Sequence, residues 1–491
     1  MRKSGILLPI SALPSSHGIG TFGKAAYQFA DFLHASGQRC WQILPLGPTG
    51  YGDSPYQSFS TFAGNPYFID LDLLAEQGML TDDEIAAADL DGDAERVDYE
   101  KQYQNRYPLL RLAFTRGEET YRDQLRAFCA QNVDWLPDYA LFMALKAHFG
   151  GQPFQEWDED IKLREVAALD RYRSELAEEI RFHEFLQMLF FDQYYALKQY
   201  VNDREIEIIG DIPIYVAPDS ADAWANSEVF WLDDDMNPIK VAGCPPDAFS
   251  ATGQLWGNPL YDWETLERAG FKWWIDRIRQ ISRLYDRVRI DHFRGFEAYW
   301  AIPFGDKTAE HGEWVKGPGM ALFDAVKSEL GEVNIIAEDL GYLTDGVIEL
   351  RDRTGYPGMK VLQFAFDSRE ESDYLPHNYP KNCVVYTGTH DNDTVGGWFD
   401  SAPQADVDFA MRYLDIAPRD NYIWKFIRAA WSSVADLSIA QMQDFLELSS
   451  EARMNTPSTL GGNWVWRMRQ DDLTSRLCEK LRMMTKLYGR I

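Results

Sequence analysis

The chain of 491 residues carries 77 acidic against 48 basic residues, and its formal net charge of −29 makes nucleic acid and anionic lipid poor partners. Hydrophobic residues make up 45% of the chain, so a sizeable core can be buried, and the length suits a barrel of ~250 residues with large insertions. The five cysteines are far apart and never form a Cys-x-x-Cys pair, which favours a reducing compartment over a disulfide framework or a zinc site. We expect a cytoplasmic protein, because the apolar start before Pro9 is too short for a signal peptide and no apolar run approaches ~18 residues.

Apolar runs typical of buried parallel strands recur along the chain, with helical patterns between them. The runs span residues 5–8, 40–44, 206–216, 288–293, 334–339, 359–366 and 383–387, and a weaker eighth lies near 434–439. Helical periodicity is found, for example, at 25–36, 273–285 and 319–330. Strands and helices that alternate over eight units predict an α/β fold, a (β/α)8 TIM barrel, with residues 1–491 forming a single catalytic domain.

Three long segments interrupt this alternation. Residues 74–202 show almost only helical periodicity, which predicts a helical insertion after the second strand. Residues 217–262 are rich in Pro, Gly, Asp and Trp, and we expect an irregular loop there, a candidate lid. Residues 392–433 are a third insertion, after the seventh strand.

Three of the predicted strands end on an acid that is followed within a few residues by Gly or Asn. These acids are Asp291, Glu338 and Asp391. The carboxyl ends of the strands of a (β/α)8 barrel meet at one mouth, where such enzymes place their active sites. The sequence therefore predicts acid–base and nucleophilic chemistry by carboxylates.

The surroundings of the first two acids suggest different roles. Arg289 and Asp291 share one face of a strand, and a neighbouring cation favours the ionised carboxylate that a nucleophile needs, although a structural ion pair would have the same spacing. A Glu that is partly desolvated at a barrel mouth tends towards a raised pKa, which suits Glu338 as a general acid. Asp339 is its rival, because alternation sends the two side chains to opposite sides and the pattern alone gives near-even odds between them.

Two further motifs have a structural as well as a functional interpretation. Asp391 follows His390 and could be held by it, although Asp391 or Asn392 could instead open the next helix as an N-cap. The segment Gly18-Ile-Gly-Thr-Phe-Gly23 formally matches the dinucleotide fingerprint, yet nine residues separate it from the preceding strand, so we expect an ordinary loop and no cofactor. No calcium-binding loop pattern occurs, and we expect no metal.

Longer motifs spread over nearly the whole chain form one further pattern. They include Leu8-Pro-Ile-Ser-Ala-Leu-Pro14, Trp41-Gln-Ile-Leu-Pro-Leu-Gly-Pro48, Gly52-Asp-Ser-Pro-Tyr-Gln57, Gly210-Asp-Ile-Pro-Ile-Tyr-Val216 and the long stretch over 242–262. With the three acid motifs, these segments resemble the amylomaltase family, also called disproportionating enzymes or 4-α-glucanotransferases. The resemblance implies a (β/α)8 barrel with helical insertions that acts on α-1,4-glucans with retention of configuration.

The resemblance also implies a role for each matching residue. Asp291 takes the place of the nucleophile, Glu338 that of the acid/base, which settles the choice against Asp339, and Asp391 that of the transition-state stabiliser. The implied substrate-binding residues are Tyr56, Asp211, Gln254, Trp256, Arg289, His292, His390 and Asn463. Among these, Tyr56 matches the aromatic that stacks on the sugar, and Gln254 and Trp256 lie in the segment that resembles the family's flexible lid.

The predicted activity is transfer of a segment of a 1,4-α-D-glucan to the 4-hydroxyl of an acceptor glucose or glucan. In such a retaining double displacement the two carboxyl groups stand ~5–5.5 Å apart. Maltooligosaccharides and dextrins derived from amylose or glycogen are the expected substrates. Three alternatives are an α-glucan hydrolase, a catalytically silent glucan-binding protein and, most weakly, a nicotinamide oxidoreductase.

Overall fold

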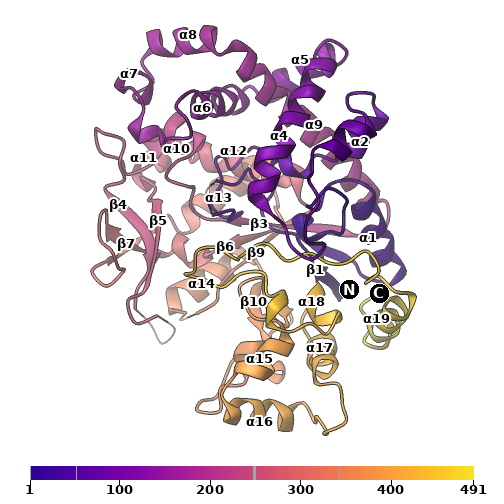
Figure 1. Ribbon diagram of the computed structural model, residues 1–491. Coiled ribbons are helices and arrows are strands. Elements are labelled where there is room, and N and C mark those ends of the chain that lie inside the picture. Colours follow the sequence, from indigo (N-terminus) through magenta and orange to yellow (C-terminus); the bar gives the residue numbers. More distant parts are fainter. Residues whose placement is uncertain (1, 51, 247–249, 342) are drawn as a thin grey trace.

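The computed structural model describes residues 2–50, 52–246, 250–341 and 343–491. Within them, eight parallel strands form one sheet in the order β10-β11-β12-β1-β2-β3-β6-β9 (Figure 1). The strands are β1 (Lys3–Leu7), β2 (Cys40–Gln42), β3 (Glu207–Pro213), β6 (Arg287–Asp291), β9 (Ile335–Ala337), β10 (Gly358–Val361), β11 (Cys383–Tyr386) and β12 (Leu437–Gln441). The first and last strands of this order, β10 and β9, also meet. The amide of Ala337 in β9 donates to the carbonyl of Pro357, just before β10, at 2.9 Å, which closes the sheet. The predicted (β/α)8 barrel is therefore confirmed, and β12 is its weakly signalled eighth strand.

A cluster of apolar side chains fills the interior of this barrel. It consists of Leu7, Cys40, Ile209, Ile336, Met359, Val361, Val384, Tyr386, Leu437 and Ile439. Side chains two residues apart on a strand share a face, so Asp211 continues the inward row of Ile209, and Glu338 continues that of Ile336. Both acids therefore lie beyond the apolar layer, towards the carboxyl end of the barrel.

Amphipathic helices cover the outside of the barrel. They include α1 (Lys24–Ala35), α9 (Ala177–Asn202), α12 (Lys272–Leu284), α13 (Met320–Leu330), α14 (Asp345–Thr354), α17 (Tyr422–Ser432) and α19 (Ser475–Leu487). Helix α12 illustrates the pattern, since Trp274, Ile278 and Ile281 recur at helical spacing and are buried, whereas Lys272 is exposed. The helices predicted at 25–36, 273–285 and 319–330 are confirmed as α1, α12 and α13.

The regular structure between β2 and α9 is helical. This region contains α2 (Leu71–Glu76), α3 (Asp82–Ala87), α4 (Tyr99–Gly117), α5 (Arg122–Gln131), α6 (Leu136–His148), α7 (Glu159–Lys162) and α8 (Val166–Glu175). In Figure 1 most of these helices lie above the barrel. Helix α9 contacts α4, α5, α6 and α8 and also packs on α1 and β3, so it joins the helical region to the wall of the barrel.

A small antiparallel sheet lies beside the barrel (Figure 1, left). Its order is β5-β4-β7-β8, with β4 (Lys240–Cys244), β5 (Gln254–Pro259), β7 (Ala298–Pro303) and β8 (Glu313–Lys316). The expectation of an irregular loop over 217–262 was wrong in this respect, because the segment contains β4, β5 and also α10 (Ala221–Ala225). Strand β4 pairs with β7, which follows dozens of residues later, so the local pattern could not reveal the pairing. Residues 247–249 of the predicted lid lie outside the described part of the chain.

The third interruption, after β11, is also helical. It contains α15 (Val395–Ser401), α16 (Gln404–Tyr413) and α17, which lie at the bottom of Figure 1. Two short helices complete the set, α11 (Trp263–Arg268) and α18 (Met442–Phe445). How these segments divide into domains stays a prediction.

The glycines of the segment 18–23 are explained by close packing. A Cβ on Gly20 would lie 1.8 Å from the carbonyl oxygen of Ile10, and one on Gly23 would lie 1.9 Å from Oδ2 of Asp70. Both positions therefore require glycine for steric reasons alone. The expected ordinary loop thus accounts for this segment without a nucleotide.

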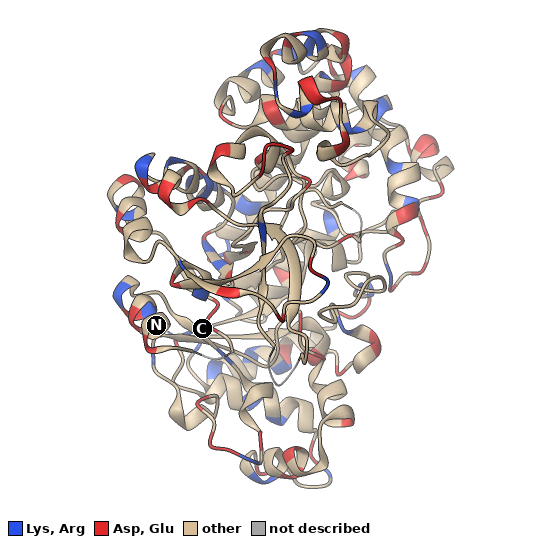
Figure 2. Cartoon of the chain, turned by 90° about the vertical axis from the view of Figure 1, so that its left-hand side faces the viewer, with Lys and Arg blue, Asp and Glu red and all other residues tan. Residues whose placement is uncertain are grey.

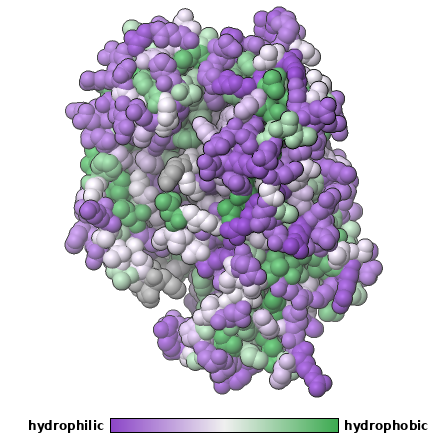
Figure 3. Space-filling model, in the orientation of Figure 1, coloured by the Kyte–Doolittle hydropathy of each residue, from purple (hydrophilic) through white to green (hydrophobic). Residues whose placement is uncertain are grey.

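Charged residues of both signs are interspersed on the helices around the molecule (Figure 2). On the face seen in Figure 3, hydrophobic side chains are scattered among hydrophilic ones. In the residues that the structure describes, no helix combines the length and the apolar character that crossing a membrane would require.

Arg490 ties the C-terminus to the barrel, and its loss should destabilise the fold. Its buried guanidinium donates to the carbonyls of Trp431, Lys3, Ala435 and Ser433 at 2.7, 2.9, 3.0 and 3.1 Å. Because each buried carbonyl left without a donor costs about 1–3 kcal/mol, we expect Arg490→Met to lower the free energy of unfolding by about 3 kcal/mol.

Denaturant unfolding followed by circular dichroism measures this difference. Arg482→Met is the matched control, since Arg482 is exposed on α19, the helix that precedes Arg490, and its effect should stay within about 0.5 kcal/mol. Equal stabilities of the two variants would contradict a structural role for Arg490.

Candidate active site

A buried cation links two carboxylates at the carboxyl end of the barrel. Nη1 of Arg289 donates to both oxygens of Asp211, at 2.9 and 2.7 Å, and Nη2 donates to Oδ1 of Asp291 at 2.6 Å. Burial alone would lower the pKa of Arg289, but Asp211 and Asp291 raise it well above its ordinary value. The guanidinium therefore stays charged and places a full positive charge beside Asp291.

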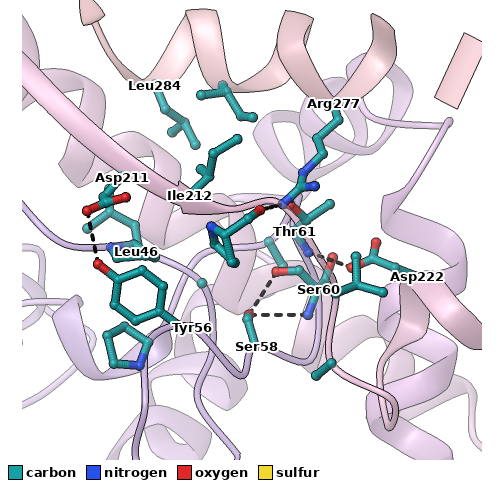
Figure 4. Close-up of a pocket in the computed structure, with 18 of the residues that line it drawn as sticks. Leu46, Tyr56, Ser58, Ser60, Thr61, Asp211, Ile212, Asp222, Arg277 and Leu284 are labelled. Atoms are coloured by element: carbon teal, nitrogen blue, oxygen red, sulfur yellow. Dashed lines mark hydrogen bonds between the residues drawn. The ribbon is translucent and has the colours of Figure 1, made fainter. Parts of the chain in front are cut away.

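Tyr56 extends this chain of interactions on the far side of Asp211. Its hydroxyl donates to Oδ2 of Asp211 at 2.9 Å (Figure 4). Burial raises the pKa of Asp211 to about 6, against the opposing effects of Arg289 and His390. The Tyr56 ring stacks on His390, with centroids 5.2 Å apart and an angle of 22° between the planes. Tyr56 and Asp211, both predicted to contact substrate, thus belong to one hydrogen-bonded network with Arg289.

Glu338 lies next to Asp291 and is held by backbone amides. The amide of His292, the residue after Asp291, donates to Oε2 of Glu338 at 2.7 Å, and the amide of Leu340 donates to Oε1 at 3.0 Å. Burial and then the negative charge of Asp291 raise the pKa of Glu338 to about 8, although Arg289 and the two amides oppose this. At neutral pH this carboxyl group is mostly protonated, as a general acid must be.

Asp339, the alternative to Glu338 as the general acid, is held by an ion pair and a backbone hydrogen bond and so has a structural role. It is buried, Arg351 Nη1 donates to its Oδ2 at 2.8 Å, and the amide of Met359 donates to its Oδ1 at 2.7 Å. Strand alternation thus sends Asp339 away from the barrel axis, into an ion pair with α14 and a hydrogen bond with β10. Between the two neighbours, only Glu338 is placed beside Asp291.

Asp391 interacts with His390 and with a distant segment of the chain. Nε2 of His390 lies 3.3 Å from Oδ2 of Asp391, and Nδ2 of Asn455 donates to Oδ1 at 2.6 Å. Burial alone would raise the pKa of Asp391, but His390 and Asn455 hold it below its usual range. Burial alone would lower the pKa of His390, but Asp391 raises it above its ordinary value. Since the Tyr56 hydroxyl lies 3.5 Å from Nδ1 of His390, the network runs from Asp291 to Asp391 without a break.

The segment 453–455 is a part of the site that the sequence analysis missed. Besides the Asn455 side chain, the amide of Asn455 donates to the carbonyl of His390 at 3.1 Å, and Nη2 of Arg453 donates to the carbonyl of Asp391 at 2.6 Å. The segment therefore holds His390 and Asp391 by backbone and side chain together. Its sequence signal was only a set of turn-forming residues around Asn455-Thr-Pro, which does not reveal a contact 64 residues away.

The small antiparallel sheet supplies one wall beside these acids. The Trp256 ring of β5 packs edge-on against His292, with centroids 4.7 Å apart, and its Nε1 donates to Oε1 of Gln254 at 3.1 Å. His292 has a left-handed backbone with φ of 56°, a conformation uncommon outside glycine and found at functional sites. Burial lowers the pKa of His292 to about 3, with Arg294 adding to the effect, so the ring is neutral.

Asn463 is the last of the residues predicted to bind substrate. Its side chain forms hydrogen bonds within its own loop. Its Oδ1 accepts from the amide of Thr456 at 3.0 Å, and its Nδ2 donates to the carbonyl of Thr459 at 3.1 Å. The next residue, Trp464, brings this loop to the site, because its ring lies 5.7 Å from that of Tyr56. No cluster of His, Cys, Asp or Glu suited to a metal ion is found among the described residues.

The pKa of Glu338 should depend on the charge of Asp291. In Asp291→Asn that charge is removed, so we expect the pKa of Glu338 to fall below about 8 but to stay above its ordinary 4.5, because burial is the larger cause. Titration of the glutamate side-chain ¹³C resonances by NMR measures the change. Asp408→Asn, which alters an exposed acid on α16, should leave the value as it is. An unchanged pKa in Asp291→Asn would show that the two carboxyl groups are not coupled.

Known proteins resemble this chain over nearly its whole length. A family model described as 4-alpha-glucanotransferase matches residues 8–474. The chain is 53% identical to the 4-alpha-glucanotransferase of Streptococcus pneumoniae over 494 residues, covering 100% of this chain and 98% of the relative. It is 51% identical to that of Clostridium butyricum over 483 residues, covering 98% and 99%. The amylomaltase from Streptococcus agalactiae, solved in complex with acarbose, has a TM-score of 0.97 at 44% identity, with 100% of both chains covered. The chain therefore belongs to the 4-alpha-glucanotransferase family, retaining enzymes that act on α-1,4-glucans.

Proposed function

We propose that Asp291 is the nucleophile, Glu338 the general acid/base and Asp391 the transition-state stabiliser of the glucan transfer reaction. The observation that carries this proposal is a pair of neighbouring carboxyl groups in different electrostatic environments. Asp291 lies 2.6 Å from a buried cation, whereas the pKa of Glu338 is raised to about 8. A retaining mechanism needs this division, because one group attacks as an anion while the other delivers a proton.

In the first step, a carboxylate oxygen of Asp291 attacks the anomeric carbon of the sugar at the cleavage point. The bond from that carbon to the bridging oxygen breaks, and the proton of Glu338 moves to this oxygen. The products are a glycosyl ester on Asp291 and a shortened glucan that leaves with a free 4-hydroxyl. Glu338 is now an anion, stabilised by the amides of His292 and Leu340.

In the second step, Glu338 acts as a base. It takes the proton of the acceptor's 4-hydroxyl while the hydroxyl oxygen attacks the anomeric carbon and displaces Asp291. The second displacement restores the original configuration and regenerates both carboxyl groups in their starting forms. Arg289 meanwhile stabilises the departing carboxylate of Asp291.

Asp391 would act on the sugar between these two displacements. The pKa of this residue is held below its usual range by His390 and Asn455, so it stays an anion while it accepts hydrogen bonds from ring hydroxyls. Those bonds strengthen as the sugar flattens towards the oxocarbenium-like state, and this difference between ground and transition state is what accelerates the reaction.

The remaining predicted residues would bind the glucan around the cleavage point. Tyr56 offers an aromatic face for the sugar. Its ring is held in place by Asp211 and His390, and the nucleophile is held by Arg289. Trp256 and Gln254 would cover the site next to His292. A wall that excludes water favours attack by a sugar hydroxyl over hydrolysis. Asn463 would line the cleft through its loop.

The substrates that we propose are maltooligosaccharides and longer dextrins derived from amylose or glycogen. One observation on a relative supports carbohydrate binding, since the Streptococcus agalactiae amylomaltase was solved in complex with acarbose. Because the sequence indicates a reducing compartment, we also propose that the protein works in the cytoplasm.

Incubation of the purified protein with maltotriose alone tests the function. We expect glucose and a ladder of longer maltodextrins while total reducing ends stay constant, because each transfer breaks one glycosidic bond and forms another. Chromatography by size and a reducing-end assay follow both quantities. Rising reducing ends without longer products would mean hydrolysis and would contradict the proposed exclusion of water.

Replacement of each carboxyl group separates the two roles. Asp291→Asn and Glu338→Ala should each lower kcat on maltotriose by at least ~10³-fold. With a glucosyl fluoride donor, only Glu338→Ala should keep rapid formation of the glycosyl ester, because fluoride leaves without a proton. Mass spectrometry of the quenched protein detects that ester. A trapped ester in Asp291→Asn, or full activity of either variant, would overturn the assignment.

Asn455 should affect kcat because it positions the carboxylate of Asp391. Asn455→Ala removes the 2.6 Å hydrogen bond to the Asp391 carboxylate, and a bond to a charged group is worth about 1.5–3 kcal/mol. We expect kcat to fall ~10–100-fold with a smaller change in KM, measured by initial rates on maltotriose. Asn382→Ala, at an exposed position, is the control. Equal kcat values in the two variants would remove Asn455 from the proposed mechanism.

A further inference from the structure

One buried carboxylate holds both ends of the loop 387–395, which carries Asp391. Asp444 lies on α18, directly after β12, and its side chain is fully buried. Its Oδ2 accepts from the Thr387 hydroxyl at 2.6 Å, and its Oδ1 accepts from the Val395 amide at 2.7 Å. Thr387 lies four residues before Asp391 and Val395 four residues after it, so Asp444 joins the two ends of the loop.

A carboxylate suits this place because two donors need two acceptor oxygens, and an asparagine side chain has only one. Burial raises the pKa of Asp444 to about 6, although the bonds from Thr387 and Val395 oppose this, so the group is mostly ionised at neutral pH. Burying a charge is costly unless hydrogen bonds offset the cost. Among the described residues, both hydrogen bonds to this carboxylate come from the loop, so the loop is what stabilises the buried charge.

The chain that follows Asp444 contacts the same loop again. Ser450 Oγ donates to Oδ2 of Asp393 at 2.7 Å, and the segment 453–455 binds the loop at its centre, as described above. One continuous stretch, residues 444–455, therefore holds the loop at its centre and, through Asp444, at both ends. The carboxylate and the central contacts thus act on the same structural unit.

The position of this loop decides where two predicted site residues lie. Nε2 of His390 lies 3.3 Å from the carboxylate of Asp391, and both residues are in the middle of the loop 387–395. A displacement of about 1 Å in a catalytic group can cost ~100-fold in rate. We propose that Asp444 is a positioning residue of the glucan transfer reaction, which sets where His390 and Asp391 meet the sugar by fixing both ends of their loop. The inference rests on the role proposed above for Asp391.

Initial rates on maltotriose test the proposal. Asp444→Asn should lower kcat by ~10–100-fold with a smaller change in KM, because Asp391 acts mainly on the transition state. Asp70→Asn is the matched control, since Asp70 is 5% exposed and also accepts from one threonine hydroxyl and one backbone amide, those of Thr21 and Leu73. Both variants should lose stability in denaturant unfolding, but only Asp444→Asn should lose turnover. Equal kcat values in the two variants would overturn the proposal.

Variants of Thr387 test the same contact without changing a charge. Thr387→Val keeps a branched side chain of similar size but removes the hydroxyl that donates to Asp444. We expect kcat on maltotriose to fall ~10-fold, as for the loss of one hydrogen bond. Thr387→Ser keeps the hydroxyl and should retain most of the wild-type kcat. A serine variant as slow as the valine variant, or a valine variant as fast as the wild type, would contradict the proposal.

Titration of His390 gives a second readout that does not need turnover. Because Asp391 raises the pKa of His390 against the effect of burial, a loop that loosens should let this pKa fall. We expect the fall in Thr387→Val and not in Thr387→Ser, measured by NMR of ¹⁵N-labelled histidine with the resonance assigned from His390→Gln. An unchanged pKa in Thr387→Val would refute the positioning role, whether or not the protein transfers glucan. A wild-type protein that does not lengthen maltotriose would instead refute the proposed function.

Discussion

The buried ion pairing of Arg289 is the interaction on which the rest of the site depends. Burying the charge of a guanidinium that is 3% exposed is costly unless carboxylates lie beside it, and Asp211 and Asp291 provide them on two neighbouring strands, β3 and β6. The same contacts fix the nucleophile at the strand end and raise the pKa of Arg289. Removing Asp211 would leave the buried guanidinium with one of its two carboxylate partners, so this acid serves the fold and the chemistry together.

The network that starts at Arg289 gives each acid a different environment within a short distance. Asp291 has a cation at 2.6 Å, Glu338 has backbone amides and the negative charge of Asp291 nearby, and Asp391 has His390 and Asn455. These environments raise the pKa of Glu338 and hold that of Asp391 below its usual range. The barrel supplies the frame, because strands β6, β9 and β11 point their carboxyl ends at one mouth.

Segments far apart in sequence complete the frame that the barrel begins. The antiparallel sheet brings Trp256 against His292, and the segment around Asn455 holds both carbonyls and the carboxylate of the His390–Asp391 pair. The segment after β2 carries Tyr56 to the mouth, where its hydroxyl donates to Asp211. The segments inserted between the strands therefore form the walls of the candidate active site, whereas the interior of the barrel is apolar.

The sequence by itself determined the barrel and its acids. Apolar strand runs are local patterns, and three of them end on an acid, so the sequence predicted the barrel, several of its helices and the position of Asp291, Glu338 and Asp391 after strand-like runs. Strand alternation could not choose between Glu338 and Asp339 from the residues alone, and the tertiary structure separates them because Asp339 pairs with Arg351 while Glu338 lies beside Asp291. The pairing of β4 with β7, the contact of Asn455 with Asp391 and the hydrogen bonds of Asp444 were likewise decided only in three dimensions. Each of these joins residues dozens of positions apart, and such contacts leave no periodic signal in the segments that make them.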